Sequence, residues 1–252
     1  MMAKIALVTG ATSGIGEATA RIFAENGIDL IICGRREDRL KKLAEEFGEK
    51  VNVMYLAFDV KNKEKVLEAI ESIPESMSKI DILVNNAGNA HGLDSIQNGD
   101  LDDWDAMIDI NVKGLLYVSK AVMPGMVDRK SGHIINIGSI AGKEVYPNGN
   151  VYCASKHAVD AINKGMLLDL NPYGIKVTAI NPGLVNTEFS EVRFKGDESK
   201  AENVYKGMDP LLGEDIAELI YFAVSRPAHV NISDLTVLPT AQASATVVNR
   251  DV

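Results

Sequence analysis

The sequence of 252 residues has few cysteines and no long apolar run. Its two cysteines, Cys33 and Cys153, cannot make a disulfide framework, and no C-x-x-C or Cys/His cluster suggests a metal site. No apolar stretch approaches the roughly 18 residues that a membrane-spanning helix needs. The chain starts Met1-Met2-Ala3-Lys4 and enters an apolar run directly, without a signal-peptide pattern. We therefore expect a soluble, cytoplasmic protein without a membrane partner.

Positive charge and aromatic side chains are also scarce. The chain carries 26 basic and 35 acidic side chains, a net charge of −9, and has no basic run. Nucleic acids and anionic membranes are therefore poor candidates as partners, and a small-molecule substrate is the better expectation. Aromatic residues make up only 6%, while there are 21 glycines. This balance favours an α/β protein with tight turns over a β-sandwich.

Short apolar runs rich in Val, Ile and Leu alternate with amphipathic segments. Each run is too short for a buried helix and predicts a buried strand, whereas the segments between have helical spacing, as in Leu40, Leu43 and Phe47. This alternation predicts one domain over residues 1–252, with a doubly wound parallel sheet of about seven strands and helices on both faces. The predicted strands are Ile5–Val8, Leu30–Cys33, Val53–Phe58, Ile80–Val84, Ile134–Ile137, Val177–Ile180 and Leu235–Leu238.

Chemically suggestive residues directly follow six of these runs. In order along the chain they are Gly10, Arg35, Asp59, Asn85–Gly88, Ser139 and Pro182–Gly183. The carboxyl ends of parallel strands meet at one edge of a sheet, and ligands bind there. Random placement would scatter such residues over both edges, so this shared edge predicts the functional site.

The first of these sites is a glycine-rich turn, Thr9–Gly16. Gly10, Gly14 and Gly16 let the backbone approach a pyrophosphate, whose charge the following helix N-terminus stabilises. The spacing is G-x-x-x-G-x-G, and a tight turn without a ligand is the alternative. Because the turn follows a first strand, we predict dinucleotide binding by these glycines and by the turn residues Thr12, Ser13 and Ile15.

The second strand ends in Arg35 and Arg36, where an acidic residue would usually hold a free ribose 2′-hydroxyl. Guanidinium groups suit a phosphate, so the pair predicts NADP(H) rather than NAD(H). The alternative is that Arg36 and Arg39 only form the solvent face of the next helix, near Glu37 and Asp38.

Two further strand ends carry polar groups toward the predicted cofactor. Asp59, which Val60 follows, either caps the next helix or contacts the adenine. Asn85 and the segment 86–88 follow the fourth strand, and their amides have donors and acceptors that can tie strand ends together and line the cleft. The alternative is an ordinary Asn-rich turn. Asp59, Val60, Asn86, Ala87 and Gly88 are predicted cofactor-binding residues.

Tyr152 and Lys156 form the predicted chemical centre. At i and i+4 of a helix they lie on one face, and a nearby ammonium lowers the pKa of a phenol. Ser139 could hydrogen-bond a substrate oxygen. Asn111 lies within Leu101–Val127, which predicts one long helix or two abutting helices with a local break. A packed phenol beside a snorkelling lysine is the alternative for the Tyr–Lys pair.

In combination, these motifs resemble the short-chain dehydrogenase/reductase family over nearly the whole chain. The matching residues are Thr9-Gly10-x-x-x-Gly14-x-Gly16, Asn85-Asn86-Ala87-Gly88, Asn111, Ser139, Tyr152-x-x-x-Lys156 and Pro182-Gly183. The resemblance implies a Rossmann-type fold that binds NAD(P)(H) and an Asn-Ser-Tyr-Lys catalytic tetrad. Tyr152 would be the general acid/base, Lys156 would bind the nicotinamide ribose and lower the tyrosine pKa, Ser139 would polarise the carbonyl, and Asn111 would hold a water.

The resemblance also assigns the segments after the sixth strand. Pro182, Gly183, Val185 and Thr187 would cover the nicotinamide, and the polar residues 188–210, which we call the lid segment, would cover the substrate. The family's use of the last strand for assembly implies a homotetramer.

Four segments resemble more narrowly a bacterial subgroup that acts on 3-hydroxy acids such as serine and 3-hydroxypropionate. They are 190–197, Gly34–Arg36, Pro147–Tyr152 and 227–232. Arg193 could clamp a substrate carboxylate, or it could be an exposed arginine. His91 and Tyr146 could also border the predicted pocket, but such residues are more often ordinary loop residues, and neither is predicted to be catalytic.

These observations predict an NADP(H)-dependent dehydrogenase that transfers hydride from the 3-hydroxyl of a small 3-hydroxy acid, with Ser139, Tyr152 and Arg193 contacting the substrate. One alternative is a reductase of neutral ketones or of 3-ketoacyl carrier protein, although an acidic carrier would favour a basic rim. The other is an NADP-binding regulator without catalysis, for which an intact tetrad is unusual.

Overall fold

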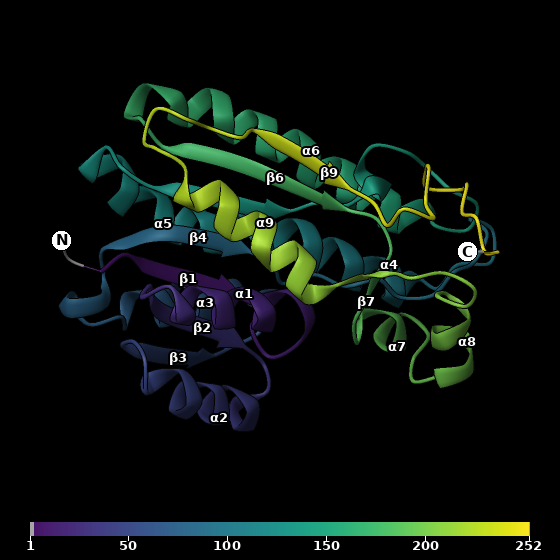
Figure 1. The fold of residues 1–252 in the computed structure, drawn as a ribbon, viewed down its shortest axis with the longest axis horizontal. Coiled ribbons are helices and arrows are strands. Elements are labelled where there is room, and N and C mark those ends of the chain that lie inside the picture. The colour runs from purple at the N-terminus through teal and green to yellow at the C-terminus, as the bar shows by residue number, and fades with distance from the viewer. Residues whose placement is uncertain (1–2, 252) are drawn as a thin grey trace.

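The computed structural model describes residues 3–251, and seven parallel strands form its central sheet (Figure 1). Their order is β3 (Val53–Ala57), β2 (Asp29–Gly34), β1 (Ile5–Thr9), β4 (Ile80–Asn85), β5 (His133–Ile137), β6 (Lys176–Pro182) and β9 (Asp234–Val237). All seven predicted strands are therefore present, and the predicted single-domain α/β fold is confirmed. Residues 1, 2 and 252 of the predicted domain lie outside the described part.

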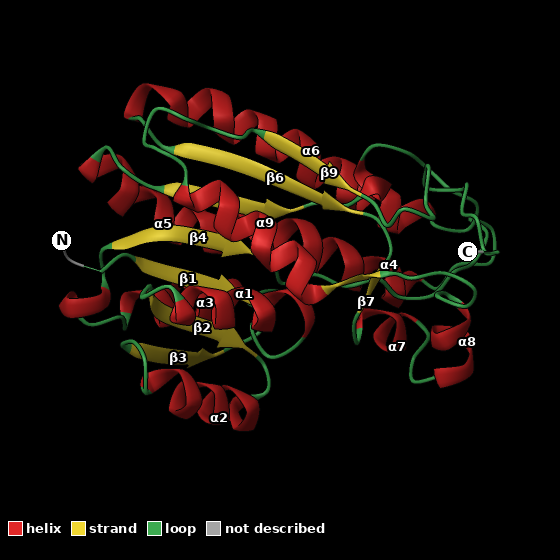
Figure 2. Cartoon of the chain, in the orientation of Figure 1, coloured by secondary structure: helices red, strands yellow, loops and turns green. Residues whose placement is uncertain are grey.

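Alternating strand residues build two hydrophobic cores, one on each face of the sheet. Ile31 and Cys33 point to one face, and their neighbours Leu30 and Ile32 point to the other. The first face is covered by α3 (Lys63–Glu71), α5 (Leu115–Arg129) and α6 (Asn150–Leu170). The second is covered by α1 (Gly14–Glu25), α2 (Glu37–Gly48) and α9 (Gly213–Ser225) (Figure 2). The predicted helices on both faces are thus confirmed.

The order of the strands reverses between β1 and β4, which are neighbours in the sheet. This is the position at which doubly wound sheets open a ligand crevice. The side chain of Asn86 joins the two strand ends, because its Nδ2 donates to the carbonyl oxygen of Thr9 at 2.9 Å. The expectation that these asparagines tie neighbouring strand ends is confirmed.

The segment expected to be helical over Leu101–Val127 consists of α4 (Leu101–Ile108), a π-helical turn η2 (Asp109–Gly114) and α5. The break at Asn111 is the one that its polar side chain predicted. Its Oδ1 accepts from the Asn89 backbone N–H at 2.8 Å, and its Nδ2 donates to the Asn89 carbonyl at 2.8 Å and to Ser155 Oγ at 3.0 Å. These bonds anchor the widened turn, which is the kind of helix defect often found at functional sites.

Small elements lie beyond the carboxyl edge of the sheet, at the right of Figure 1. They are β7 (Val185–Asn186), α7 (Phe189–Arg193), α8 (Glu198–Asn203) and β8 (Leu211–Leu212), and β7 pairs with β8 in parallel. Two-residue strands are too short to show a period in the sequence. Short 3-10 turns lie at Glu75–Met77, Ile140–Gly142 and Asn171–Tyr173. None of the helices within residues 3–251 has the length and apolarity to cross a membrane.

The first residue of β5 is a histidine whose burial predicts an acid-sensitive fold. His133 is 4% exposed, and its Nε2 shares a hydrogen bond of 2.8 Å with Thr178 Oγ1. Burial, assisted by the positive charge of Lys176, lowers the pKa of His133 from its ordinary 6.5 to about 3. The unfolded chain therefore binds a proton below about pH 6.5 that the folded chain refuses until about pH 3. Between these values His133 reduces the free energy of unfolding by about 1.4 kcal/mol for each pH unit of acidification.

Replacing His133 with glutamine should flatten this acid dependence. Urea unfolding at intervals from pH 6.5 down to pH 4 would measure it, with the variant losing less stability than the wild type over that window. Parallel stability curves for the two proteins would show that His133 does not titrate as its burial requires.

Candidate active site

A cleft of about 340 Å³ opens at the carboxyl edge, between the strand ends and the lid segment. Most of the sequence-predicted site residues line it. They are Gly10, Thr12, Ser13, Gly14, Ile15, Arg35, Arg36, Asp59, Val60, Asn86, Ala87, Gly88, Ser139, Tyr152, Lys156, Pro182, Gly183, Val185, Thr187 and Arg193. Gly16 and Asn111 do not line the cleft themselves. The residues that follow separate strands in the sequence thus meet at one site.

The glycine-rich turn has the geometry of a cradle for a dinucleotide. Gly10 has a φ of 66° and Gly14 a φ of 53°, which side-chain-bearing residues rarely adopt. A Cβ on Gly16 would lie 2.3 Å from the Gly10 carbonyl oxygen, so this position packs the turn against α1 rather than lining the cleft. The first backbone N–H groups of α1 follow this turn and favour an anion. The residues present therefore fit a pyrophosphate.

The structure distinguishes between the alternative roles predicted for Arg36, after β2, and for Asp59, after β3. Arg36 turns back onto the glycine-rich turn rather than toward solvent, and its Nη2 donates to Ser13 Oγ at 2.8 Å. Arg35 is more exposed than Arg36, and its Nη1 lies 3.9 Å from Asp59 Oδ2. Asp59 does not cap α3, because the side chain of Asn62 takes that role by accepting from the Lys65 backbone N–H. The helix-cap alternative for Asp59 is therefore wrong.

The tetrad residues come from three elements and converge on the cleft. Tyr152 and Lys156 lie one turn apart on α6, and both are buried. Lys156 Nζ donates to the Ile137 carbonyl at the end of β5, at 2.9 Å. Ser139 follows the same strand. A Cβ on Gly88 would lie 3.1 Å from Asn111 Oδ1 and 3.6 Å from Lys156 Nζ, so these two side chains flank Gly88.

The electrostatics of the phenol differ from the sequence expectation. Burial raises the pKa of Tyr152, Tyr146 adds to that rise, and Ser139 and Arg193 partly oppose it. Lys156 Nζ donates to the Ile137 carbonyl, and burial lowers the pKa of Lys156 to about 8. A lowering of the Tyr152 pKa by Lys156 stays a prediction, because helical spacing alone does not orient the ammonium.

Arg193, the last residue of α7 in the lid segment, contacts the side chains of Tyr146 and Tyr152. Its Nε donates to the Gly92 carbonyl and its Nη1 donates to the Tyr146 hydroxyl, both at 3.1 Å. Its Cζ lies 5.6 Å from the ring centroids of both Tyr146 and Tyr152. Its Nη2 is buried and has no hydrogen-bond partner among residues 3–251. The structure thus excludes a simple solvent-exposed arginine, and it links Tyr146 to the site.

Some residues of the cleft were not predicted from the sequence. The Phe189 ring lies 5.7 Å from that of Tyr152, and Glu188 pairs with two arginines at the opposite end of the cleft. Tyr205 donates to the Val185 carbonyl at 2.7 Å and bonds Ser190 Oγ, which holds the lid segment to the strand end. The negative charge of Glu188 is the one sequence feature that could suggest pairing with the arginines after β2. Because Glu188 lies 152 residues from Arg36, no local pattern indicates that pairing.

Comparisons with known proteins agree with this geometry. The family model described as short chain dehydrogenase matches residues 4–198. The NADP-dependent 3-hydroxy acid dehydrogenase YdfG of Salmonella typhi is 48% identical over 242 residues, covering 96% of this chain and 97% of its own. The sulfoacetaldehyde reductase 2 of Chromohalobacter salexigens is 45% identical, with 99% and 100% covered. A closed form of serine dehydrogenase complexed with NADP⁺ superposes with a TM-score of 0.92 at 46% identity, covering 96% of this chain and 98% of that one.

Proposed function

Because the chain belongs to the short-chain dehydrogenase family, we propose that it is an NADP(H)-dependent oxidoreductase of small 3-hydroxy acids. It would oxidise the 3-hydroxyl of a substrate such as serine or 3-hydroxypropionate, or reduce the corresponding carbonyl. Relatives named for NADP-dependent 3-hydroxy acid and serine dehydrogenases support both the cofactor and the substrate class. The two arginines after β2 support NADP(H) independently.

In this proposal the cofactor would lie across the carboxyl edge of the sheet. The glycine-rich turn would hold its pyrophosphate, and Arg35 and Arg36 would hold its adenosine 2′-phosphate. The path to the nicotinamide would be lined by Asp59, Val60, Asn86, Ala87 and Gly88, and the nicotinamide would be covered by Pro182, Gly183, Val185 and Thr187. When bound, the nicotinamide accepts or supplies the hydride. Lys156 keeps donors beyond its bond to Ile137, and these would hold the ribose hydroxyls.

Tyr152 moves the substrate proton in this scheme. Its phenolate oxygen would act as general base and take the proton of the substrate hydroxyl, and the resulting phenol would return that proton as general acid in the reverse direction. Ser139 Oγ donates to the developing substrate oxygen. Both Nδ2 hydrogens of Asn111 are taken by Asn89 and Ser155 and its Oδ1 accepts from Asn89, so a water of the proton relay would bind its remaining acceptor sites on Oδ1 or the main chain.

The observation that carries the substrate class is the buried, unbonded Nη2 of Arg193 beside Tyr152. A buried guanidinium N–H without a partner is costly, and an anion in the cleft would satisfy it. In a 3-hydroxy acid, the carboxylate that Arg193 would hold is two bonds from C3, the carbon whose hydroxyl would react beside Tyr152. The same group would also receive a sulfonate, which is the chemistry named for the sulfoacetaldehyde reductase relative. A small sulfonate alcohol is therefore the second candidate substrate.

Replacing Arg193 with methionine tests the clamp. We expect the KM for 3-hydroxypropionate to rise about 10- to 100-fold, because a charge-assisted hydrogen bond is lost. The neutral analogue 1,3-propanediol should keep its kcat/KM in steady-state assays of NADPH formation. Lys195→Met is the matched control, because Lys195 lies two residues further on, is exposed and pairs with Asp103. Equal losses for acid and diol would assign Arg193 a purely structural role.

Two further expectations remain predictions for this chain. The lid segment, whose residues Phe189, Arg193 and Tyr205 line the cleft, is proposed to cover the substrate. A homotetramer is expected from the family resemblance, and β9 at the edge of the sheet would be part of its interface.

A further inference from the structure

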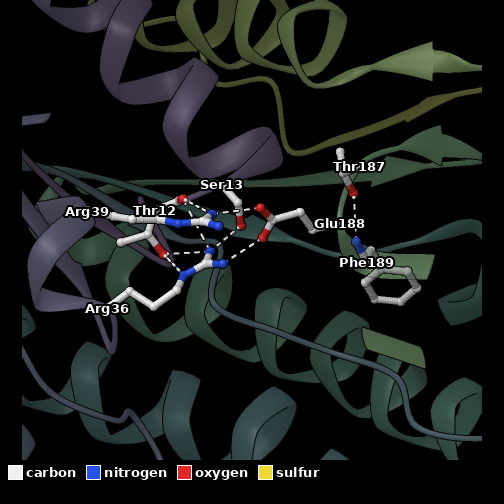
Figure 3. Close-up of polar contacts among 7 residues, drawn as sticks. All are labelled: Thr12, Ser13, Arg36, Arg39, Thr187, Glu188 and Phe189. Carbon is white, nitrogen blue, oxygen red and sulfur yellow. Dashed lines mark hydrogen bonds and ion pairs between the residues drawn. The ribbon is translucent and has the colours of Figure 1, made fainter. Parts of the chain in front are cut away.

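One carboxylate of the lid segment lies between two arginines at the β2 end of the cleft (Figure 3). Glu188 Oε2 accepts from Arg36 Nη1 at 2.7 Å, and Glu188 Oε1 accepts from Arg39 Nη1 at 2.6 Å. Although burial raises the pKa of Glu188, the hydrogen bonds from Arg39 and Arg36 outweigh that effect and lower it. Each oxygen of this anion is thus matched to a separate guanidinium.

The same guanidinium groups are also fixed by the glycine-rich turn. Arg36 donates from Nε and Nη2 to Thr12 Oγ1 at 3.1 and 2.9 Å, and from Nη2 to Ser13 Oγ at 2.8 Å. Arg39 Nη1 donates to the Thr12 carbonyl at 3.3 Å. The arginines are therefore held in place at the end of β2, where the ribose of a dinucleotide lies in this fold.

We propose that Glu188 sets the cofactor preference by competing with the 2′-phosphate of NADP(H) for Arg36 and Arg39. This inference rests on the proposed function. A 2′-phosphate near Arg35 and Arg36 draws on the Arg36 guanidinium that Glu188 holds, so it has to displace or share that contact. A 2′-hydroxyl makes no such demand, and a cofactor without the phosphate leaves the contacts of Glu188 with Arg36 and Arg39 intact. Glu188 therefore weakens the binding of the phosphorylated cofactor specifically, and the NADP preference that Arg35 and Arg36 create is smaller than it would be without Glu188.

The competition also links the two ends of the cleft. Glu188 is the N-terminal cap of α7, and Arg193 is the last residue of that five-residue helix. Release of Glu188 by a 2′-phosphate removes one attachment of the first turn of α7, while Ser190 remains bonded to Tyr205 and Arg193 remains bonded to Gly92 and Tyr146.

Two nucleotides that differ only at the 2′ position test the competition. Isothermal titration calorimetry with adenosine 2′,5′-bisphosphate and with AMP would be performed on the wild type and on Glu188→Gln. We expect the variant to bind the bisphosphate about 5-fold more tightly, because two partly exposed ion pairs no longer oppose it. Its affinity for AMP should change by less than 2-fold. Glu191→Gln is the matched control on the same helix, since Glu191 is exposed and its side chain bonds none of the described residues.

The outcomes separate this inference from the proposed function. A wild type that prefers the bisphosphate, with an unchanged or weaker preference in Glu188→Gln, would overturn the competition and leave the NADP site standing. Equal binding of the two nucleotides by both the wild type and Glu188→Gln would overturn the NADP site and the competition together. If Glu191→Gln also bound the bisphosphate more tightly, the gain in affinity would come from the lower negative charge of the protein, and competition by Glu188 would be overturned.

Discussion

Replacing Tyr152 with phenylalanine should lower kcat by roughly 10²–10⁴-fold, the usual contribution of a positioned acid/base. The variant loses only the hydroxyl, so the ring should keep its packing against Phe189 and its contact with Arg193. The free energy of unfolding should therefore change by less than about 1 kcal/mol. Initial rates of NADPH formation at saturating substrate measure the effect, and NADPH fluorescence titration should show unchanged cofactor binding.

The matched control for this variant is Tyr173→Phe, because Tyr173 is 40% exposed and lies in the turn before β6, whereas the cleft lies at the carboxyl end of that strand. It should retain wild-type kcat. If Tyr152→Phe kept more than a tenth of the wild-type kcat, another group would be the acid/base, and the scheme proposed for the tetrad would be wrong.

Replacing Lys156 with methionine is the second change with a large expected effect. Methionine fills most of the same volume but removes a buried ammonium that faces the cleft. We expect kcat/KM to fall by about 10²-fold or more, as when one preorganised donor is removed from an active site. The affinity for NADP(H) should fall as well, because the ribose loses a donor. Steady-state kinetics and fluorescence titration would measure the two effects separately.

The neighbouring Lys164 provides a control on the same helix. Its side chain is exposed and pairs with Asp160, so Lys164→Met should leave both quantities nearly unchanged. Burial lowers the pKa of Lys156 to about 8, so wild-type Lys156 loses its charge as the pH rises through that value. An alkaline decline near pH 8 that persisted in Lys156→Met would belong to another group.

The location of the site could be predicted from the sequence because it depends on strand order and not on side-chain detail. Apolar runs of four to six residues predicted all seven strands, and parallel strands bring their carboxyl ends to one edge. Gly10, Asn86 and Ser139 therefore met in one cleft although they are far apart in the chain. Strand ends were less accurate, as for β6, which extends to Lys176 and Pro182 beyond the predicted Val177–Ile180.

The electrostatics of the site could not be predicted in this way, because they depend on burial and on long-range pairing. Spacing placed Lys156 near Tyr152 but did not show that its ammonium points to Ile137. The contact of Arg36 with Glu188 joins residues 152 positions apart, with no local pattern to indicate it. Tyr146 was considered more readily an ordinary loop residue than a site residue, and its hydrogen bond to Arg193 appears only in the folded chain.

We propose above all that the protein oxidises small 3-hydroxy acids with NADP in this cleft. Its most direct test is the initial rate of reduced-cofactor formation by the purified protein with L-serine, 3-hydroxypropionate, a 3-hydroxybutyrate, 2-hydroxyethanesulfonate and neutral alcohols. Each substrate would be assayed with NADP and with NAD. The account predicts turnover of the 3-hydroxy acids, with kcat/KM higher for NADP than for NAD. Turnover of the neutral alcohols alone, or of no compound while NADPH still binds, would contradict it.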